Sequence, residues 1–233
     1  MDYRDRHVVV TGGTGALGTA VVRTLIEAGA HCHVPCVHEG EAQRFPLRRH
    51  EKVALIAVSD LADEAAVAKV YDRVPKLWAS IHLAGGFAMS PVAETDKAAL
   101  MQQLGMNFLT CFLCCRAAVN AFARAGDGGR IVNVAARPGL EWRSGAGMAA
   151  YTASKAAIAA LTVALAEEVA KDGILVNAVA PSIMDTAANR AAMPKADFAA
   201  WPKVEEVAAT IAFLASPENK VTRGGIVPVY GRS

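Results

Sequence analysis

The chain has 233 residues, of which 53% are hydrophobic and 20% are charged, a composition that excludes intrinsic disorder and supplies enough apolar side chains for one large domain or two small ones. Its 24 Lys and Arg residues nearly balance its 22 Asp and Glu residues, so the net charge of +2 argues against nucleic acid as a partner. The charged N-terminus, and apolar runs shorter than the roughly 20 residues of a membrane span, predict an unprocessed cytoplasmic protein with no membrane partner.

Short β-like runs alternate with longer helical runs along the chain, a pattern typical of parallel βαβ units. It predicts strands at 7–11, 31–37, 53–58, 80–84, 130–134, 174–178 and 226–229, and helices at 15–28, 65–74, 98–125, 149–171 and 204–215. We expect an α/β fold with residues 1–233 in a single domain, built on a Rossmann-type doubly wound parallel sheet of about seven strands. The irregular segments 136–148 and 181–203 follow the fifth and sixth strands, where ligands bind in such sheets.

The glycine-rich segment from Thr11 to Gly18, TGGTGALG, stands between the first predicted strand and the first helix. Glycines let the backbone approach a pyrophosphate, and a helix N-terminus offers N–H donors to it. We therefore predict a dinucleotide cofactor, bound through Gly12, Thr14, Gly15, Ala16, Leu17 and Gly18. The alternative is a tight strand-to-helix turn that binds nothing.

The end of the second predicted strand bears on the choice between NAD and NADP. An acidic residue there marks NAD sites, but Pro35 to His38 contains none, and the first carboxylate is Glu39. The sequence thus slightly favours NADP, with His38 or Arg44 meeting the 2′-phosphate. After the third strand, Asp60 and Leu61 occupy the place of an adenine-contacting pair, although they could equally belong to a helix N-cap region.

Tyr151 and Lys155 are four residues apart in a predicted helix and therefore share one face. An ammonium about 4 Å from a phenol, at an effective dielectric constant near 20, favours the phenolate by about 4 kcal/mol, or about three pKa units before desolvation opposes it. Such a pair can act as a tuned general acid. The alternative is an exposed tyrosine beside an unrelated lysine.

Together with these motifs, further segments make the whole chain resemble the short-chain dehydrogenase/reductase family. They are Ala84-Gly85-Gly86, Asn107, Asn177 to Pro181 and Gly224-Gly225-Ile226. The resemblance implies that Tyr151 donates the proton, that Lys155 lowers its pKa and holds the nicotinamide ribose, and that Asn107 fixes a water in a proton relay. It also implies that Ala84, Gly85, Gly86, Tyr151, Lys155, Pro181 and Ile183 contact the cofactor.

The chain departs from this family where a serine normally follows the fifth strand, because Ala135 and Ala136 stand there and Ser144 is the nearest hydroxyl in the next loop. Dihydropteridine reductases, a branch that also lacks the serine, show segments similar to Gly85-Gly86-Phe87, Asp185-Thr186, Asn189-Arg190, Met193-Pro194, Ala196 to Phe198 and Trp201. An electrophilic quinonoid ring needs little carbonyl polarisation. The expected substrate contacts are Phe87, Ala136, Trp142 and Trp201, although the aromatic side chains could equally serve packing.

These observations predict a reductase that transfers hydride from NAD(P)H to a small, flat, dihydropterin-like substrate. The alternatives are a ketone or 3-oxoacyl reductase and a cofactor-sensing binding module. Small residues over more than one face of helix 149–171 predict a homodimer or homotetramer.

The cysteines and histidines suggest no metal site in the sequence. His31 and His33 of the second strand point to one face, whereas Cys32 and Cys36 point to the other. Cys111, Cys114 and Cys115 fall at helical spacing in an apolar stretch, which predicts reduced thiols in the core.

Overall fold

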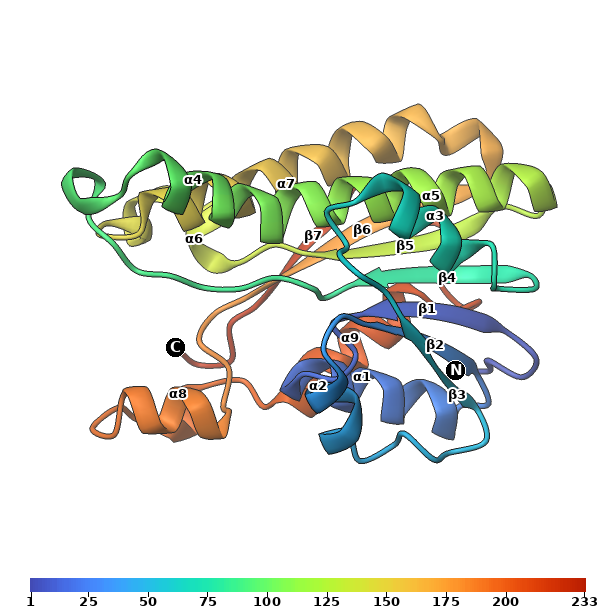
Figure 1. Cartoon of the computed structure of the whole chain (residues 1–233), viewed down its shortest axis with the longest axis horizontal. Coiled ribbons are helices and arrows are strands. Elements are labelled where there is room, and N and C mark those ends of the chain that lie inside the picture. Colours follow the sequence, from blue (N-terminus) through green and yellow to red (C-terminus); the bar gives the residue numbers. More distant parts are fainter.

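Seven parallel strands form one sheet in the order β3-β2-β1-β4-β5-β6-β7 in the computed structural model, which describes residues 1–233 (Figure 1). The strands are β1 (His7–Thr11), β2 (His31–Cys36), β3 (Val53–Ala57), β4 (Leu77–His82), β5 (Gly129–Val134), β6 (Ile174–Pro181) and β7 (Ile226–Val229). The predicted doubly wound α/β sheet is confirmed. Its strand order reverses between β1 and β4, and a ligand crevice opens at such a switch point.

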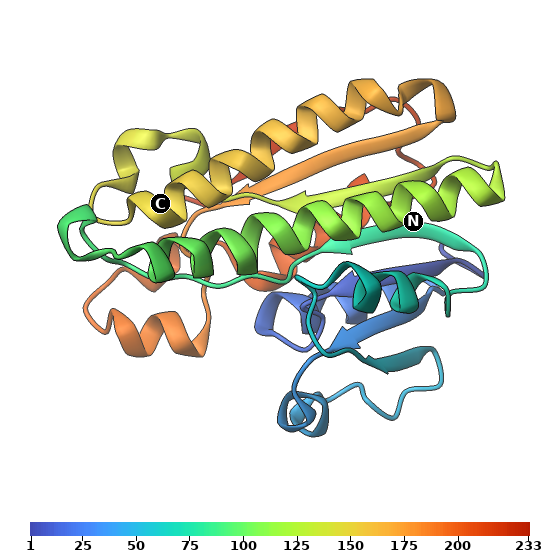
Figure 2. The same cartoon turned by 45° about the horizontal axis from the view of Figure 1, so that its top comes forward.

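Helices cover both faces of the sheet (Figures 1 and 2). On one face lie α1 (Ala16–Glu27), α2 (Glu39–Arg44) and α9 (Val204–Leu214), and on the other α3 (Glu64–Tyr71), α4 (Lys97–Gln103), α5 (Thr110–Ala125) and α7 (Ala149–Glu168). The short helices α6 (Arg137–Leu140) and α8 (Ala187–Ala192) lie in the two segments predicted as irregular. A π-helix, Leu104–Leu109, joins α4 to α5.

Two apolar cores, one on each face, explain why the strands are hydrophobic throughout. In β1, Val9 packs into one core, whereas Val8 and Val10 pack into the other, and all three are fully buried. The side-chain period of two residues in a strand produces this division. Covering both faces therefore requires continuous apolar strands rather than alternating ones.

Two predicted elements differ from the structure in an informative way. The fourth strand runs from Leu77 to His82 instead of 80–84, and beyond it the backbone N–H groups of Leu83 and Ala84 donate to the Thr11 carbonyl and hydroxyl. The predicted helix 98–125 is interrupted by the π-helix rather than being continuous.

The long apolar helices and the cysteines belong to the core of this fold. Segments 97–125 and 149–168 are long and apolar enough to cross a membrane, but here they pack against the sheet. All five cysteines are free and buried, which confirms the core thiols predicted at Cys111, Cys114 and Cys115. His7 lies beside both His31 and His33, with ring centroids 5.2 Å away in each case, while Cys32 is buried in the core formed by α1 and α9.

Candidate active site

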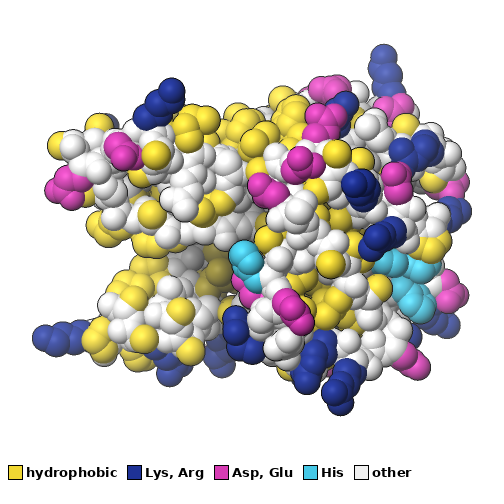
Figure 3. Space-filling view, viewed as in Figure 1, with side chains coloured by type: hydrophobic (Ala, Val, Ile, Leu, Met, Phe, Trp, Pro, Cys, Tyr) yellow, Lys and Arg dark blue, Asp and Glu magenta, His cyan; other side chains and the backbone are white.

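A cleft opens at the carboxyl ends of the strands, between the helices above the sheet and the lobe that contains α8. Figure 3 shows this hollow, with apolar side chains along its walls. The segment between β6 and α9, predicted as irregular, forms the lower lobe (Figure 1).

The glycine-rich turn connects β1 to α1 with its backbone exposed to a ligand. Gly12 has a φ of +65°, and a Cβ there would lie 2.7 Å from the backbone nitrogen of Ala84. A Cβ on Gly18 would overlap the carbonyl oxygen of Gly12, so the helix packs closely on the turn only with glycine at this position. No side chain caps the start of α1 at Gly15, which leaves the first N–H groups of the helix available to an anion.

Asn107 is fully buried and holds the segment that follows β4. Its Oδ1 accepts from the backbone N–H of Gly86 at 3.1 Å, and its Nδ2 donates to the carbonyl of Gly86 at 3.0 Å. The π-helix that carries it is a feature found frequently at functional sites. A Cβ on Gly85 would lie 2.5 Å from Asn107 Oδ1 and 3.7 Å from Lys155 Nζ, so these three residues meet at one point.

Tyr151 and Lys155 lie one turn apart near the start of α7. Lys155 Nζ donates to the carbonyl of Val134, the last residue of β5, at 2.9 Å. The ring of Tyr151 meets the ring of Phe87 edge to face, with centroids 5.0 Å apart. The structure thus brings together the predicted catalytic residues with the segments that follow β4 and β5.

Desolvation governs the protonation of both groups. Burial raises the pKa of Tyr151 to about 12 and lowers the pKa of Lys155 to about 8. The lowering of the tyrosine pKa that we expected from its neighbour is outweighed here, because no hydrogen bond joins the two side chains and the ammonium is engaged by Val134. Tyr151 therefore keeps its proton at neutral pH.

The position of the missing serine is buried and apolar. Ala136 is 6% exposed and precedes α6, so its methyl group offers no donor. Ser144 is exposed, and its hydroxyl donates to the Glu141 carbonyl at 2.8 Å, which gives it a local role in the turn. No hydroxyl from this loop replaces the missing one in the structure.

The three aromatic residues expected to contact substrate lie in different surroundings. Phe87 is 61% exposed beside Tyr151, as a wall of the cleft requires. Trp201 is buried against Phe198, which corresponds to the packing role. Trp142 does not face Tyr151. It lines a cavity of about 490 Å³ with Ala149, Thr152, Ala153 and Ala156, and at about 100° per residue these positions lie on the opposite side of α7 from Tyr151 and Lys155.

The structure places one acidic residue that we did not predict, Glu41, beside the glycine-rich turn. Glu41, in the first turn of α2, accepts a hydrogen bond from the Thr14 hydroxyl of the glycine-rich turn at 3.3 Å. The sequence pattern directs attention to the strand end, where His38 is exposed, but this acid stands five residues beyond Cys36. Its only sequence signal is an acidic first turn in a helix that we did not predict.

Asp60 and Leu61 have structural partners of their own. The Asp60 side chain accepts from the Ala62 N–H at 2.8 Å, and Leu61 is buried in the core. The N-cap of α3 is Asp63, whose carboxylate accepts from the Ala66 N–H at 2.6 Å. Asp60 is therefore exposed in the turn before α3 and accessible to a ligand, whereas Leu61 is occupied by packing.

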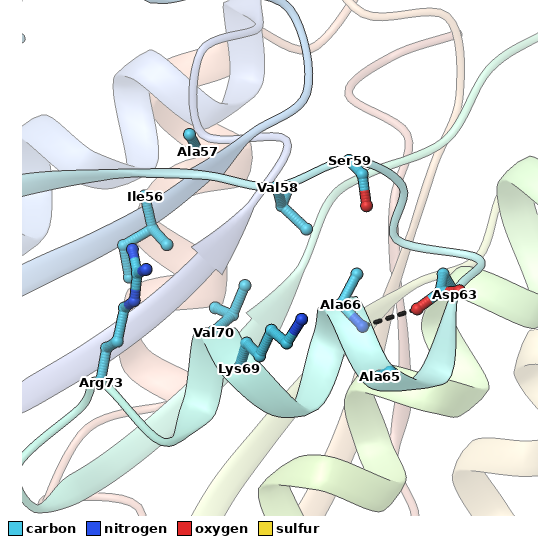
Figure 4. A pocket seen from close by; sticks show the side chains of 10 residues that line it. All are labelled: Ile56, Ala57, Val58, Ser59, Asp63, Ala65, Ala66, Lys69, Val70 and Arg73. Atoms are coloured by element: carbon cyan, nitrogen blue, oxygen red, sulfur yellow. Dashed lines mark hydrogen bonds between the residues drawn. The ribbon is translucent and has the colours of Figure 1, made fainter.

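A separate cavity of about 370 Å³ lies beside β3 and α3 (Figure 4). Lys69 of α3 and Arg73, which follows the end of α3, extend along it, and Ile56 to Ser59 form its other side. It includes neither the glycine-rich turn nor Tyr151 and Lys155, so the chemistry belongs to the cleft and not to this cavity.

Of the predicted cofactor contacts after the sixth strand, Pro181 ends β6 and Ile183 is 44% exposed.

Comparisons with known proteins show the family and the fold of this chain. The sequence model of the family described as short chain dehydrogenase matches residues 6–197. The cis-4-hydroxycyclohexanecarboxylate dehydrogenase of Sinomonas cyclohexanicum is 35% identical, covering 98% of this chain and 96% of that protein. The crystal structure of gox2181 has a TM-score of 0.90 at 27% identity, covering 99% of this chain and 96% of that one. ElxO with NADP bound has a TM-score of 0.86 at 23% identity, covering 97% of each chain, and shows the fold alone.

Proposed function

The chain belongs to the short-chain dehydrogenase family, and we propose that it is an NAD(P)-dependent oxidoreductase in which Tyr151 is the general acid. The observation that carries this proposal is the arrangement in the cleft. Tyr151 stands beside the exposed Phe87, and Lys155 lies one turn away, tied to the Val134 carbonyl. An acid that keeps its proton at neutral pH and faces an apolar wall is suited to protonating a reduced substrate.

The residues present fit a dinucleotide cofactor. Gly12 and Gly18 leave no room for side chains of their own, and the uncapped N-terminus of α1 would hold the pyrophosphate. Lys155 would hold the nicotinamide ribose, and Pro181 and Ile183, at the end of β6 and just beyond it, would contact the cofactor. When bound, NAD(P)H supplies the hydride.

Within the site, each side chain has a distinct task. Tyr151 holds the proton at its hydroxyl and passes it to the substrate atom that gains charge. Lys155, with a pKa of about 8, is mostly protonated at pH 7 and places an ammonium one turn from the phenol, where it favours the phenolate that remains. Asn107 is a positioning residue, because it fixes Gly86 from both its N–H and its carbonyl.

We propose an electrophilic ring as the substrate, dihydropterin-like in shape. With Ala136 at the place of the serine, Tyr151 is the one hydroxyl assigned to the reacting atom, so a substrate that is already electrophilic suits the site best. Phe87 supplies a flat apolar wall. Cyclic ketones are the second candidate, because the Sinomonas relative is named for a hydroxycyclohexane carboxylate.

A panel of substrates tests the proposal. Oxidation of NADPH and NADH is followed with quinonoid dihydropterin, cyclic ketones and 3-oxoacyl thioesters. Tyr151→Phe should lower turnover by about 10² or more while cofactor affinity stays within about threefold. Ala136→Ser should leave quinonoid reduction within about tenfold, whereas a ketone reductase should gain from the added hydroxyl. Cofactor binding without turnover of any substrate would instead favour a sensing module.

We propose that both NAD and NADP bind, with opposing influences on the choice. His38 at the N-cap of α2 and Arg44 at its last residue are basic side chains that favour a 2′-phosphate, and the solved structure of ElxO carries NADP. Glu41, in contact with Thr14, opposes a second negative charge at the same end of the site. The balance is measurable as the ratio of the two dissociation constants.

We also propose a cytoplasmic homodimer, or a homotetramer built from it, that forms through α5 and α7. Exposed apolar side chains lie at Leu109, which ends the π-helix before α5, at Phe112 of α5 and at Val163 of α7, each 40–44% exposed, and α7 adds small residues at Ala153 and Ala160. Burying such a face on a second copy removes it from water. Light scattering should give a multiple of the chain mass, and Val163→Glu should yield the monomer, whereas a monomeric parent would refute the assembly.

A further inference from the structure

A polar cluster that takes no part in the proposed reaction lies in the core between β4, β5 and α5. His82 ends β4, Asn133 comes from β5, and Cys111 and Cys115 come from one face of α5. All four are buried, with Asn133 fully inaccessible and the others at most 4% exposed. One ligating atom from each of His82, Cys111 and Cys115 lies within 4.8 Å of the other two.

The sulfur contacts of this cluster are close to the spacing of a tetrahedral metal site, whereas His82 Nδ1 and Asn133 Oδ1 lie at hydrogen-bond distance. Asn133 Oδ1 lies 2.8 Å from His82 Nδ1, 3.3 Å from Cys111 Sγ and 3.5 Å from Cys115 Sγ. Cys115 Sγ lies 3.5 Å from His82 Nδ1. Metal bonds of about 2.3 Å to sulfur and about 2.0–2.1 Å to nitrogen or oxygen place tetrahedral ligands roughly 3.3–3.8 Å apart. A small outward movement of the His82 and Asn133 side chains would therefore admit an ion.

One acceptor atom, Asn133 Oδ1, lies at the centre of the hydrogen bonding in this cluster. Asn133 Oδ1 faces the two thiols and the His82 ring nitrogen, but an amide oxygen has two lone pairs. Three possible donors therefore converge on one amide oxygen in a buried site. A metal ion would replace these contacts by direct bonds, and the thiols would lose their protons to it.

The surrounding side chains hold the ligands in place. The other ring nitrogen of His82, Nε2, lies 2.8 Å from Ser80 Oγ and 3.3 Å from Tyr71 Oη. Asn133 Nδ2 donates to Thr162 Oγ1 at 2.9 Å. Metal-bound histidines usually have their second nitrogen engaged in this way, which fixes both the ring and its tautomer.

We propose that His82, Cys111 and Cys115, with Asn133 Oδ1 as the fourth ligand, bind one thiophilic d¹⁰ cation, Zn²⁺ or Cu⁺. Two thiolates neutralise Zn²⁺, so the zinc-loaded site carries no net charge into the core, whereas Cu⁺ would leave one negative charge there. Because the cluster is closed to solvent, the ion enters as the chain folds. Asn133 directly precedes Val134, which holds Lys155, so the ion clamps α5 to the sheet immediately behind the catalytic lysine.

Expression of the chain without an affinity tag in media supplemented with Zn²⁺, Cu⁺ or Co²⁺ tests the site. We expect one metal ion per chain by elemental analysis, sulfur-to-cobalt charge-transfer absorption in the cobalt form, and two sulfur neighbours at about 2.3 Å in the X-ray absorption of the zinc form. Cys111→Ala and Cys115→Ala should lose the ion. The matched control is Cys114→Ala, because Cys114 is equally buried on α5 but lies outside the cluster, and this variant should keep it.

Two further measurements keep the proposal open to refutation. Zinc-loaded protein should unfold about 5 °C or more above the metal-free form, and an unchanged melting temperature would overturn the clamp. Metal-free protein from every medium, or metal kept in both cysteine variants, would overturn the site. If those variants do not fold, an absorption spectrum of the parent that shows only nitrogen and oxygen neighbours would overturn it equally.

Discussion

Replacing Glu41 with glutamine should shift the cofactor preference toward NADPH. Glutamine keeps an oxygen that can accept the hydrogen bond from the Thr14 hydroxyl, so the contact between α2 and the glycine-rich turn survives. The substitution removes only the negative charge. It therefore isolates the electrostatic part of the choice between a ribose 2′-hydroxyl and a 2′-phosphate.

The magnitude follows from the exposure of the carboxylate. Two unit charges about 4 Å apart in bulk water interact by about 1 kcal/mol, and a 2′-phosphate carries nearly two charges. Glu41 is exposed, so water and salt weaken this repulsion. We expect about tenfold tighter NADPH binding, corresponding to about 1.4 kcal/mol, and less than about threefold change for NADH.

Calorimetric titration of both cofactors at low and high salt measures the effect. The gain for NADPH should shrink at about 1 M salt, where the Debye length is about 3 Å. The matched control is Glu39→Gln, because Glu39 lies in the same turn of α2 but its carboxylate accepts from Gln43 at 3.1 Å instead of meeting Thr14. An unchanged ratio of the two dissociation constants in Glu41→Gln, or an equal shift in Glu39→Gln, would refute the reasoning.

Three further results are expected. Asn107→Ala should lower the free energy of unfolding in urea by about 2–4 kcal/mol and slow turnover, because both polar groups of the Gly86 backbone lose their partner. Unchanged kinetics would show that the Asn107–Gly86 contact does not position the site. Gly18→Ala should weaken cofactor binding by at least about tenfold in a fluorescence titration, since its Cβ meets the Gly12 carbonyl, and wild-type affinity would contradict this packing. Burial lowers the pKa of His33 from 6.5 to about 4, so as the pH falls the unfolded chain binds a proton at this histidine before the folded chain does. The free energy of unfolding should therefore fall as the pH drops from about 6.5 toward 4. His33→Leu should reduce this pH dependence of the urea midpoint.

Local pattern and spacing predicted the seven strands and the long helices, but not α2 or the π-helix, and they placed Tyr151 and Lys155 on one helix face. The alternation of apolar strands and amphipathic helices predicts the sheet, because each strand must be apolar on both faces to be covered by helices. Tyr151 and Lys155 could be paired from their spacing alone, since residues four apart on a helix share a face. The turn from Thr11 to Gly18 could be predicted from the sequence because its glycines meet requirements of the local backbone.

Interactions between distant segments were decided only by the tertiary structure. Trp142 is near Tyr151 in sequence but lies on the other side of α7, whereas Glu41 reaches the turn at Thr14 through the placement of α2. Desolvation likewise depends on what the fold packs around a group, and so the pKa of Tyr151 rises where the helix spacing alone predicted a fall.

The His82, Cys111 and Cys115 cluster depends both on local sequence and on tertiary packing. The sequence determines that both cysteines face the core, because they are four residues apart on an apolar helix. Only the pairing of β4 with β5, beneath α5, brings them to His82 and Asn133, which are 51 residues apart in sequence. Periodicity reports which face of an element is buried, but the partner across that face is set by how the elements pack together.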